Sequence, residues 1–185
     1  ALSVQPTSYE AKLLLGNVMA AQGKYIEART AFETLLSIDP DNPAGFFRLG
    51  SLDQAQRQFE AARNNYEKAL AINPGLMDVF SNLILVLGAQ QKFDEALVRC
   101  REQLKIVEGS PRMEAMVHNL MGRLYIARKD RDAAEAAFNT AIAKNQNLMQ
   151  PYYTLAQIYL GENSPDKAIE QLNRLLEVNS RQVGP

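Results

Sequence analysis

The sequence predicts an all-α solenoid built from antiparallel helix pairs, and three observations carry this prediction. One alanine recurs in steps of 34, 34, 38 and 34 residues, at Ala28, Ala62, Ala96, Ala134 and Ala168. Apolar residues on both sides of it recur with helical spacing, and no useful length of chain alternates apolar and polar residues as a strand does. A fixed period of this length is typical of stacked helical units with a shared core.

Each predicted unit contains the same parts in the same order. A first helix is followed by a short polar break and a second amphipathic helix, and in two units the second helix ends near Pro40 or Pro74, where proline cannot continue it. The polar breaks lie at 22–24, 56–58, 90–92, 128–130 and 162–164. The predicted repeats are therefore 9–42, 43–76, 77–110, 115–148 and 149–182.

Residues 111–114 interrupt the period, and we expect them to add one turn to a helix. Ser110 precedes Pro111, an order typical of a helix N-cap followed by proline at the first helical position. The expected helix runs from about Pro111 to Arg128. Ser164 and Pro165 give the same start signal for the second helix of the last repeat.

The two ends of the chain also follow the pattern. Residues 2–6 match 36–40, which predicts that 1–8 are the tail of a preceding repeat, and 183–185 stand where a further repeat would begin. Solenoids normally carry a polar capping helix at each end, and none is evident here. We therefore expect a segment of a longer array, whose uncapped terminal repeats favour end-to-end self-association.

Composition narrows the classes of partner. The chain has 185 residues, is 46% apolar, and carries a formal net charge of −1 with acidic and basic residues interleaved, unlike the concentrated basic face of nucleic-acid-binding proteins. The longest apolar run, 83–87, is far shorter than the roughly 20 residues of a membrane-spanning helix, so we expect a soluble protein without membrane insertion. The single cysteine excludes an internal disulfide and leaves the compartment open.

These recurring positions resemble the tetratricopeptide repeat, whose signature combines a Leu-Gly pair, a small alanine, aromatic residues and a terminal proline. The Leu-Gly pair is Leu15–Gly16 in the first repeat and Leu49–Gly50 in the second. The resemblance implies a right-handed superhelix in which the small residues let paired helices approach closely, so that a larger side chain would cost roughly 1–3 kcal/mol. Aromatic residues are expected to fill the space between helices and repeats: Phe46, Phe80 and Tyr152, and Tyr25, Phe59 and Phe93.

Asp53 departs from the pattern, because the other repeats carry Met, Leu or Tyr at its position. A buried carboxylate is costly unless it is paired. Arg57 follows one turn later, so we expect either an Asp53–Arg57 ion pair or a carboxylate that contacts a ligand.

No combination of residues suggests catalysis, and we interpret the chain as not an enzyme. The only histidine, His118, occupies an aromatic position of the repeat and should pack against the preceding helix, and no second His or Cys is spaced to share a metal with it. Cys100 likewise occupies an aromatic position and is expected to be buried filler. No cofactor, metal or phosphate-binding loop is predicted.

The resemblance implies that the first helices of successive repeats line a concave groove that holds a protein or peptide. Amide side chains can satisfy an extended backbone, aromatic rings offer contact area, and arginines pair with carboxylates. The candidate groove residues are Asn17, Phe47, Arg48, Ser51, Asn82, Asn119, Arg123, Tyr153 and Gln157. The positions that hold a terminal carboxylate in chaperone-binding members lack the required cations, and Asp78 has the wrong sign, so no such clamp is expected.

Three functions remain open at this point. The first is a non-catalytic protein–protein interaction scaffold that binds a peptide or helix in the groove. The second is an architectural segment of a larger machine of the bacterial envelope. Bacterial systems for exopolysaccharide export and for protein sorting contain arrays similar to this one. The third, an enzyme regulated by the repeats, requires a catalytic domain elsewhere. The resemblance favours a bacterial origin, with either the cytoplasm or the periplasm and cell envelope as the compartment.

Overall fold

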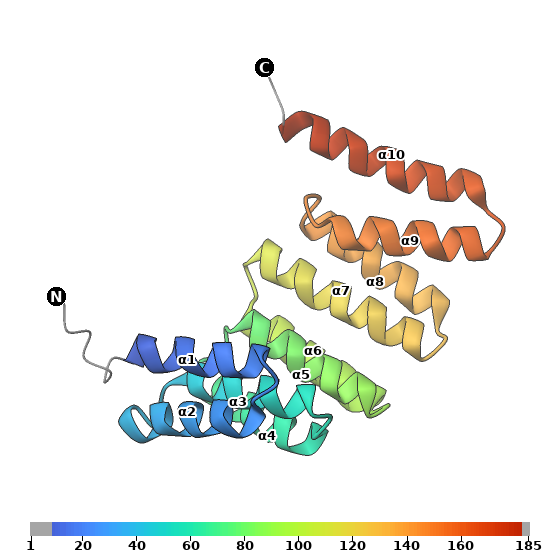
Figure 1. Ribbon diagram of the computed structural model, residues 1–185. Coiled ribbons are helices and arrows are strands. Elements are labelled where there is room, and N and C mark those ends of the chain that lie inside the picture. The colour runs from blue at the N-terminus through green and yellow to red at the C-terminus, as the bar shows by residue number, and fades with distance from the viewer. Residues whose placement is uncertain (1–8, 183–185) are drawn as a thin grey trace. The chain divides into compact units, whose positions relative to one another are not determined.

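The computed structural model describes residues 9–182, and these form ten helices and no strand (Figure 1). The helices are α1 (Tyr9–Ala21), α2 (Tyr25–Ile38), α3 (Pro43–Ala55), α4 (Phe59–Ile72), α5 (Met77–Ala89), α6 (Phe93–Ile106), α7 (Pro111–Ala127), α8 (Arg131–Lys144), α9 (Met149–Gly161) and α10 (Pro165–Gln182). The all-α prediction is confirmed. The predicted tail of a preceding repeat, 1–8, and the predicted start of a further one, 183–185, lie outside the described residues.

The helices group into two compact units that divide after Gln91. In the first unit α1 pairs with α2 and α3 with α4, while α2 packs on α3 and α4 packs on α5. Helix α3 also contacts α1 and α5, so the first helices of these repeats lie side by side. In the second unit α7 pairs with α8 and α9 with α10, while α6 packs on α7 and α8 packs on α9.

The turn between the two helices of a repeat has the same backbone conformation each time. Its middle residue has positive φ in all five turns: Gly23, Arg57, Gln91, Lys129 and Asn163. After Gly23, Arg57, Lys129 and Asn163 the next residue donates its N–H to a carbonyl five residues back, for example Gln58 to Asp53 at 2.8 Å and Ser164 to Tyr159 at 2.9 Å. This is the left-handed Schellman ending that lets an antiparallel helix begin at once.

In the first, second and fourth repeats an aromatic ring of the second helix fills the space beside a glycine of the first. An ideal Cβ built on Gly122 would lie 2.6 Å from Phe138 Cε1, and one on Gly50 would lie 2.6 Å from Tyr66 Cε1. Both rings are fully buried. Any side chain at these glycines would displace an aromatic core residue.

Helix α7 begins at Pro111 and includes the extra turn of 111–114. Ser110 stands at the N-cap position and Pro111 opens the helix, as predicted, and the Ser110 side chain makes no capping hydrogen bond. Glu114 Oε1 instead accepts the N–H of Gly109 at 2.9 Å. The carboxylate reaches back from the first turn and satisfies a donor that precedes the helix.

Candidate functional site

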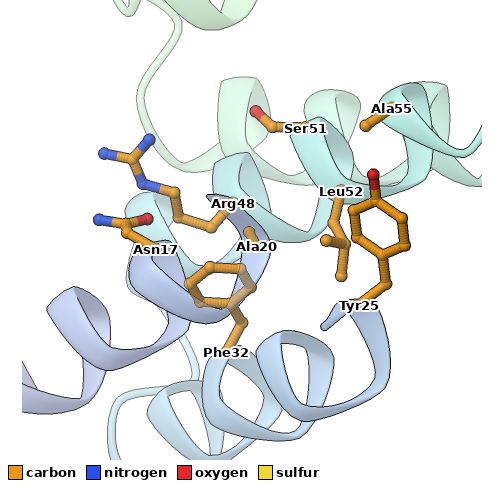
Figure 2. A pocket seen from close by; sticks show the side chains of 8 residues that line it. All are labelled: Asn17, Ala20, Tyr25, Phe32, Arg48, Ser51, Leu52 and Ala55. Carbon is orange, nitrogen blue, oxygen red and sulfur yellow. The ribbon is translucent and has the colours of Figure 1, made fainter. Parts of the chain in front are cut away.

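A cavity of about 350 Å³ lies between α1, α2 and α3 of the first unit (Figure 2). Helix α1 contributes Asn17 and Ala20, α2 contributes Tyr25 and Phe32, and α3 contributes Arg48, Ser51, Leu52 and Ala55. Three of the predicted groove residues, Asn17, Arg48 and Ser51, therefore line one cavity. They come from two first helices that contact each other directly.

One end of this cavity is polar. Figure 2 shows the side chains of Asn17 and Arg48 next to each other at this end. Phe32 and Ala20 lie nearer the middle of the cavity. The Arg48 guanidinium carbon lies 5.4 Å from the centre of the Phe47 ring. Arg48 Nε is buried, and no atom within residues 9–182 accepts a hydrogen bond from it. The guanidinium of Arg48, beside the Asn17 amide, gives this end of the cavity a cation and an amide that suit an anionic or carbonyl oxygen.

The other end of the cavity is apolar apart from one hydroxyl. Leu52 and Ala55 of α3 face Tyr25 of α2 there (Figure 2). The Tyr25 side chain is exposed, so our expectation that it fills the space between helices is wrong. Its place at the start of α2, directly after the turn, leaves the ring beside the cavity instead of between packed helices.

Two further candidates are held by neighbouring groups. The Phe47 ring lies 6.0 Å from the Tyr66 ring, and Ser51 Oγ donates to the Phe47 carbonyl at 2.9 Å. Asn82 on α5 donates through Nδ2 to the Asp78 carbonyl at 2.8 Å, one turn back on its own helix. Asn82 is not among the residues that line the cavity.

The remaining candidates belong to the second unit. Asn119 and Arg123 lie on α7, and Tyr153 and Gln157 lie on α9. Gln157 lines a second cavity of about 480 Å³, together with Ile126, Lys129, Arg131, Thr154, Ile158 and Gly161. Asn119 Oδ1 is buried without a hydrogen-bond donor among the described residues. Of these four candidates, Gln157 is therefore the one that lines the second cavity.

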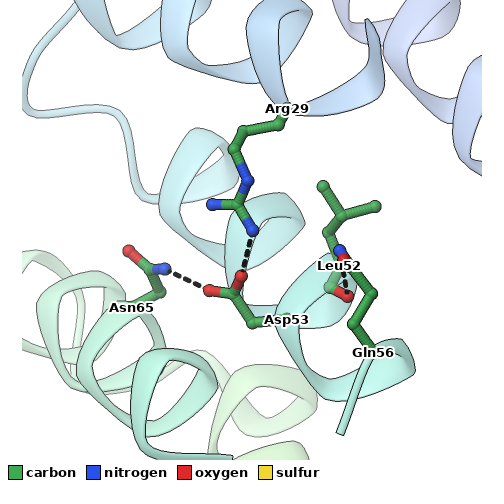
Figure 3. Close-up of polar contacts among 5 residues, drawn as sticks. All are labelled: Arg29, Leu52, Asp53, Gln56 and Asn65. Carbon is green, nitrogen blue, oxygen red and sulfur yellow. Dashed lines mark hydrogen bonds and ion pairs between the residues drawn. The ribbon is translucent and has the colours of Figure 1, made fainter. Parts of the chain in front are cut away.

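Asp53 does not pair with Arg57, so that prediction is wrong. Its fully buried carboxylate forms an ion pair with Arg29 of α2 and accepts a hydrogen bond from Asn65 Nδ2 of α4 at 2.8 Å (Figure 3). Arg57 lies beyond the end of α3 at φ 59°, and its guanidinium lies 5.9 Å from the Phe59 ring centre. Because the helix ends at Ala55, the spacing that would bring Arg57 over Asp53 is lost. Both carboxylate oxygens have partners, which leaves Asp53 a structural role.

A second polar cluster lies in the second unit. Glu114 of α7 forms an ion pair with Lys144 of α8, and Lys144 and the Gly109 N–H lower the pKa of the Glu114 carboxyl. Partial burial, followed by repulsion from Lys144, lowers the pKa of His118, while Glu114 opposes this shift. His118 is therefore neutral near pH 7.

Cys100 is fully buried, as expected, and burial raises the pKa of its thiol to about 12. Over the described part of the chain, no group of three or more His, Cys, Asp or Glu side chains is placed to hold a metal ion. None of the helices between residues 9 and 182 is long and apolar enough to cross a membrane.

Comparison with known proteins places these features in context. Profiles of the tetratricopeptide repeat match residues 9–42, 43–76 and 119–183. No curated protein sequence matches the chain.

Three solved structures illustrate the structural similarity. BtubC from P. vanneervenii has a TM-score of 0.73 at 20% identity, covering 95% of this chain and 81% of that one. TTC0263, a thermophilic tetratricopeptide-repeat protein from Thermus thermophilus, has a TM-score of 0.66 at 25% identity, covering 92% and 91%. YrrB, described as a tetratricopeptide-repeat protein with an unusual peptide-binding site, has a TM-score of 0.58 at 16% identity, covering 92% and 86%.

Proposed function

The chain belongs to the tetratricopeptide repeat family, and on that premise we propose that it is a non-catalytic scaffold that binds a peptide or helix of a partner protein on its first helices. A scaffold for protein–protein interactions is the role that this family membership supports in general. The finer assignment, to the surface formed by α1 and α3, is our own.

The observation that carries this proposal is the cavity with a polar and an apolar end. Asn17 and Arg48 can bind an oxygen of the ligand at one end, and Tyr25, Leu52 and Ala55 can bury an apolar side chain at the other. Binding pockets of this kind combine apolar lining with a few placed polar groups. The description of YrrB as peptide-binding supports the same class of ligand for a chain of similar fold.

Arg48 is the residue on which the test depends. Arg48 lines the cavity beside Asn17, and besides the buried Nε its guanidinium carries further N–H donors that can bind a ligand oxygen. Replacing Arg48 by alanine removes these donors together with the guanidinium that lies over the Phe47 ring. We expect ligand affinity to fall at least tenfold, which corresponds to about 1.4 kcal/mol.

The experiment selects short random peptides by display on the wild-type protein and measures the affinity of the enriched peptides by calorimetry. The Arg48→Ala variant is compared with Arg101→Ala, which removes an exposed arginine from α6, outside the cavity. Loss of affinity in the first variant alone supports the proposal. Equal affinity for wild type and Arg48→Ala, or no enrichment of peptides, would exclude this cavity as a peptide site.

The second candidate function is architectural, as a segment of a larger assembly. The exposed apolar residues on α1 and α10 favour it, since such residues mark interaction surfaces when they cluster. In that case Arg48→Ala in the cavity leaves assembly unchanged, while substitutions of the exposed apolar residues on α1 and α10 disrupt it.

A further inference from the structure

One packing arrangement recurs wherever a repeat meets the next one within a unit. The second helix of one repeat packs on the first helix of the following repeat, as α2 does on α3 and α8 does on α9. At the α2–α3 junction, Leu35 and Leu36 of α2 share a core with Leu49 and Leu52 of α3. At the α8–α9 junction, buried apolar residues of both helices again share one core. The junction is thus a repeated apolar interface between two defined helix faces.

Helix α1 presents the first-helix half of this interface without a preceding repeat among the described residues. Leu15 and Val18 stand 34 residues before Leu49 and Leu52, at the equivalent positions. Leu15 is 49% exposed, whereas Leu49 is 6% exposed, because α2 covers the latter. Val18 is likewise exposed where Leu52 is buried.

Helix α10 presents the other half. Leu172 and Leu176 stand 34 residues after Phe138 and Ile142, which α9 covers. Leu176 is 64% exposed and Ile142 only 3%. With Ile169, also exposed, these residues form an apolar stripe along one side of α10.

We propose that α10 of one copy of this chain docks on α1 of a second copy, in the register of the internal junctions. A second copy is the occupant that the structure favours, because the two exposed faces are the two halves of one interface that already forms inside the molecule. This contact is separate from the cavity between α1, α2 and α3 and does not depend on the function proposed for it.

Three pairs of junction positions can be compared between the internal junctions and the two ends. At the α2–α3 junction Arg29 forms an ion pair with Asp53, and at the same pair of positions in the α8–α9 junction the Tyr159 hydroxyl donates to Glu135 at 2.6 Å. At the ends of the described chain, Ile169 on α10 stands at the position of Arg29 and Glu135. Met19 on α1 stands at the position of Asp53 and Tyr159. The other two internal junctions carry Arg63 with Leu87 and Leu97 with Tyr125 at these positions, so an apolar pair at the ends lies within the range that the internal junctions already show.

A second pair of positions carries an acid and a donor. Gln90 Nε2 donates to Glu60 at 2.9 Å, and the equivalent residues Arg128 and Asp94 form an ion pair at 2.6 Å. The terminal members are Gln22 on α1 and Asp166 on α10, the same chemistry as Gln90 and Glu60. Contact between two α10 helices would instead bring like faces together and lose these pairings.

A third pair combines a large residue with a small one. An ideal Cβ on Gly45 would lie 2.8 Å from Leu36 Cγ, so the large side chain covers the small position closely. The terminal members are Leu176 on α10 and Ala11 on α1. The contact joins unlike faces, so each bound copy leaves one face open and the assembly extends head to tail until it closes into a ring or grows as a filament.

Cysteine exchange tests the register directly. An ideal Cβ at residue 45 lies 2.8 Å from Leu36 Cγ, and this Cγ is bonded directly to the Cβ of residue 36. The two Cβ atoms therefore lie within the roughly 4.5 Å between Cβ atoms that a disulfide spans. Ala11→Cys and Leu176→Cys are therefore prepared separately, and the buried native thiol of Cys100 stays unreactive. The proposal expects a covalent dimer when the two variants are mixed under mild oxidation and none from either alone. Disulfides within one variant's solution would overturn it in favour of contact between like ends.

Sedimentation over a concentration series tests the association itself. The wild type is expected to gain mass above the monomer as concentration rises, and Ile169→Lys to weaken this association at least tenfold, roughly the effect of losing a central apolar contact. Ile106→Lys is the matched control, because Ile106 is 53% exposed against 54% for Ile169 and its equivalent in the next repeat is already Lys144. Both variants should keep the wild-type circular dichroism spectrum. A monomer at every soluble concentration would overturn the proposal and assign these faces to another occupant, such as a further repeat.

Discussion

Replacing Gly50 by alanine tests whether the close approach of paired helices is set by the small residue. An ideal Cβ at this position would lie 2.6 Å from Tyr66 Cε1, 2.7 Å from Cδ1 and 3.2 Å from the Ala62 carbonyl oxygen. The Tyr66 ring is fully buried, and its hydroxyl donates to Gln54 Oε1 at 2.6 Å. The ring therefore cannot withdraw without losing core contacts or a hydrogen bond.

Two opposing effects determine how far Gly50→Ala changes the free energy of unfolding. Alanine is favoured over glycine within a helix by about 1 kcal/mol. Overpacking a core contact costs about 1–3 kcal/mol. We expect a value in the upper part of this range, because the added Cβ would lie 2.6 Å from a ring that is fully buried. We therefore expect Gly50→Ala to lower the free energy of unfolding by about 1–2 kcal/mol, measured by urea denaturation followed by circular dichroism.

Gly161 provides the matched control. It ends α9, has no atom within 4 Å of an ideal Cβ, and needs no positive φ. Gly161→Ala should leave stability unchanged or raise it by up to about 1 kcal/mol, because only the helix-propensity effect remains.

The fifth repeat suggests a compensating change. It carries Ala156 and Leu172 at the positions of Gly50 and Tyr66. In a double-mutant cycle, Gly50→Ala and Tyr66→Leu together should be less destabilising than the sum of the two by at least about 0.5 kcal/mol. A Gly50→Ala protein as stable as the wild type, or a cycle with no coupling, would refute the argument that the ring and the glycine constrain each other.

Three further predictions concern charged and reactive groups. Arg29→Met leaves the buried Asp53 carboxylate without its cation and should lower the free energy of unfolding, measured by urea denaturation, by roughly 2–4 kcal/mol. The double variant Arg29→Met with Asp53→Leu should recover most of this loss. An equal loss in the single and the double variant would contradict the argument. Because the pKa of His118 is lowered in the folded state, the unfolded chain binds the proton more tightly, so the free energy of unfolding should fall as pH drops below about 6.5, and His118→Phe should flatten this slope between pH 7 and pH 5. Ellman's reagent should react with Cys100 at least about 100-fold more slowly in the native protein than in urea at pH 8, and similar rates would show that the thiol is accessible.

The sequence predicted part of the candidate site. The resemblance to the tetratricopeptide repeat, applied in the register of this chain, pointed to Asn17, Arg48 and Ser51 on two first helices, and these residues line one cavity. The contribution of Tyr25 was missed, because its aromatic character at a repeat position indicated a core role. The distance of the ring from any covering helix is a tertiary property that the pattern does not contain.

The period, the short polar breaks and the alternation of small and large residues determined, from the sequence alone, that this chain forms stacked helix pairs. These are local or strictly periodic signals, so each repeat reports the same fold independently. The partners of buried polar groups were decided only by the tertiary structure. Asp53 bonds to Arg29, 24 residues away, because α3 ends before Arg57 and a neighbouring helix supplies the cation. The exposure of Leu15 and Leu176 was decided in the same way, since identical repeat positions are buried or exposed according to whether another repeat packs on them.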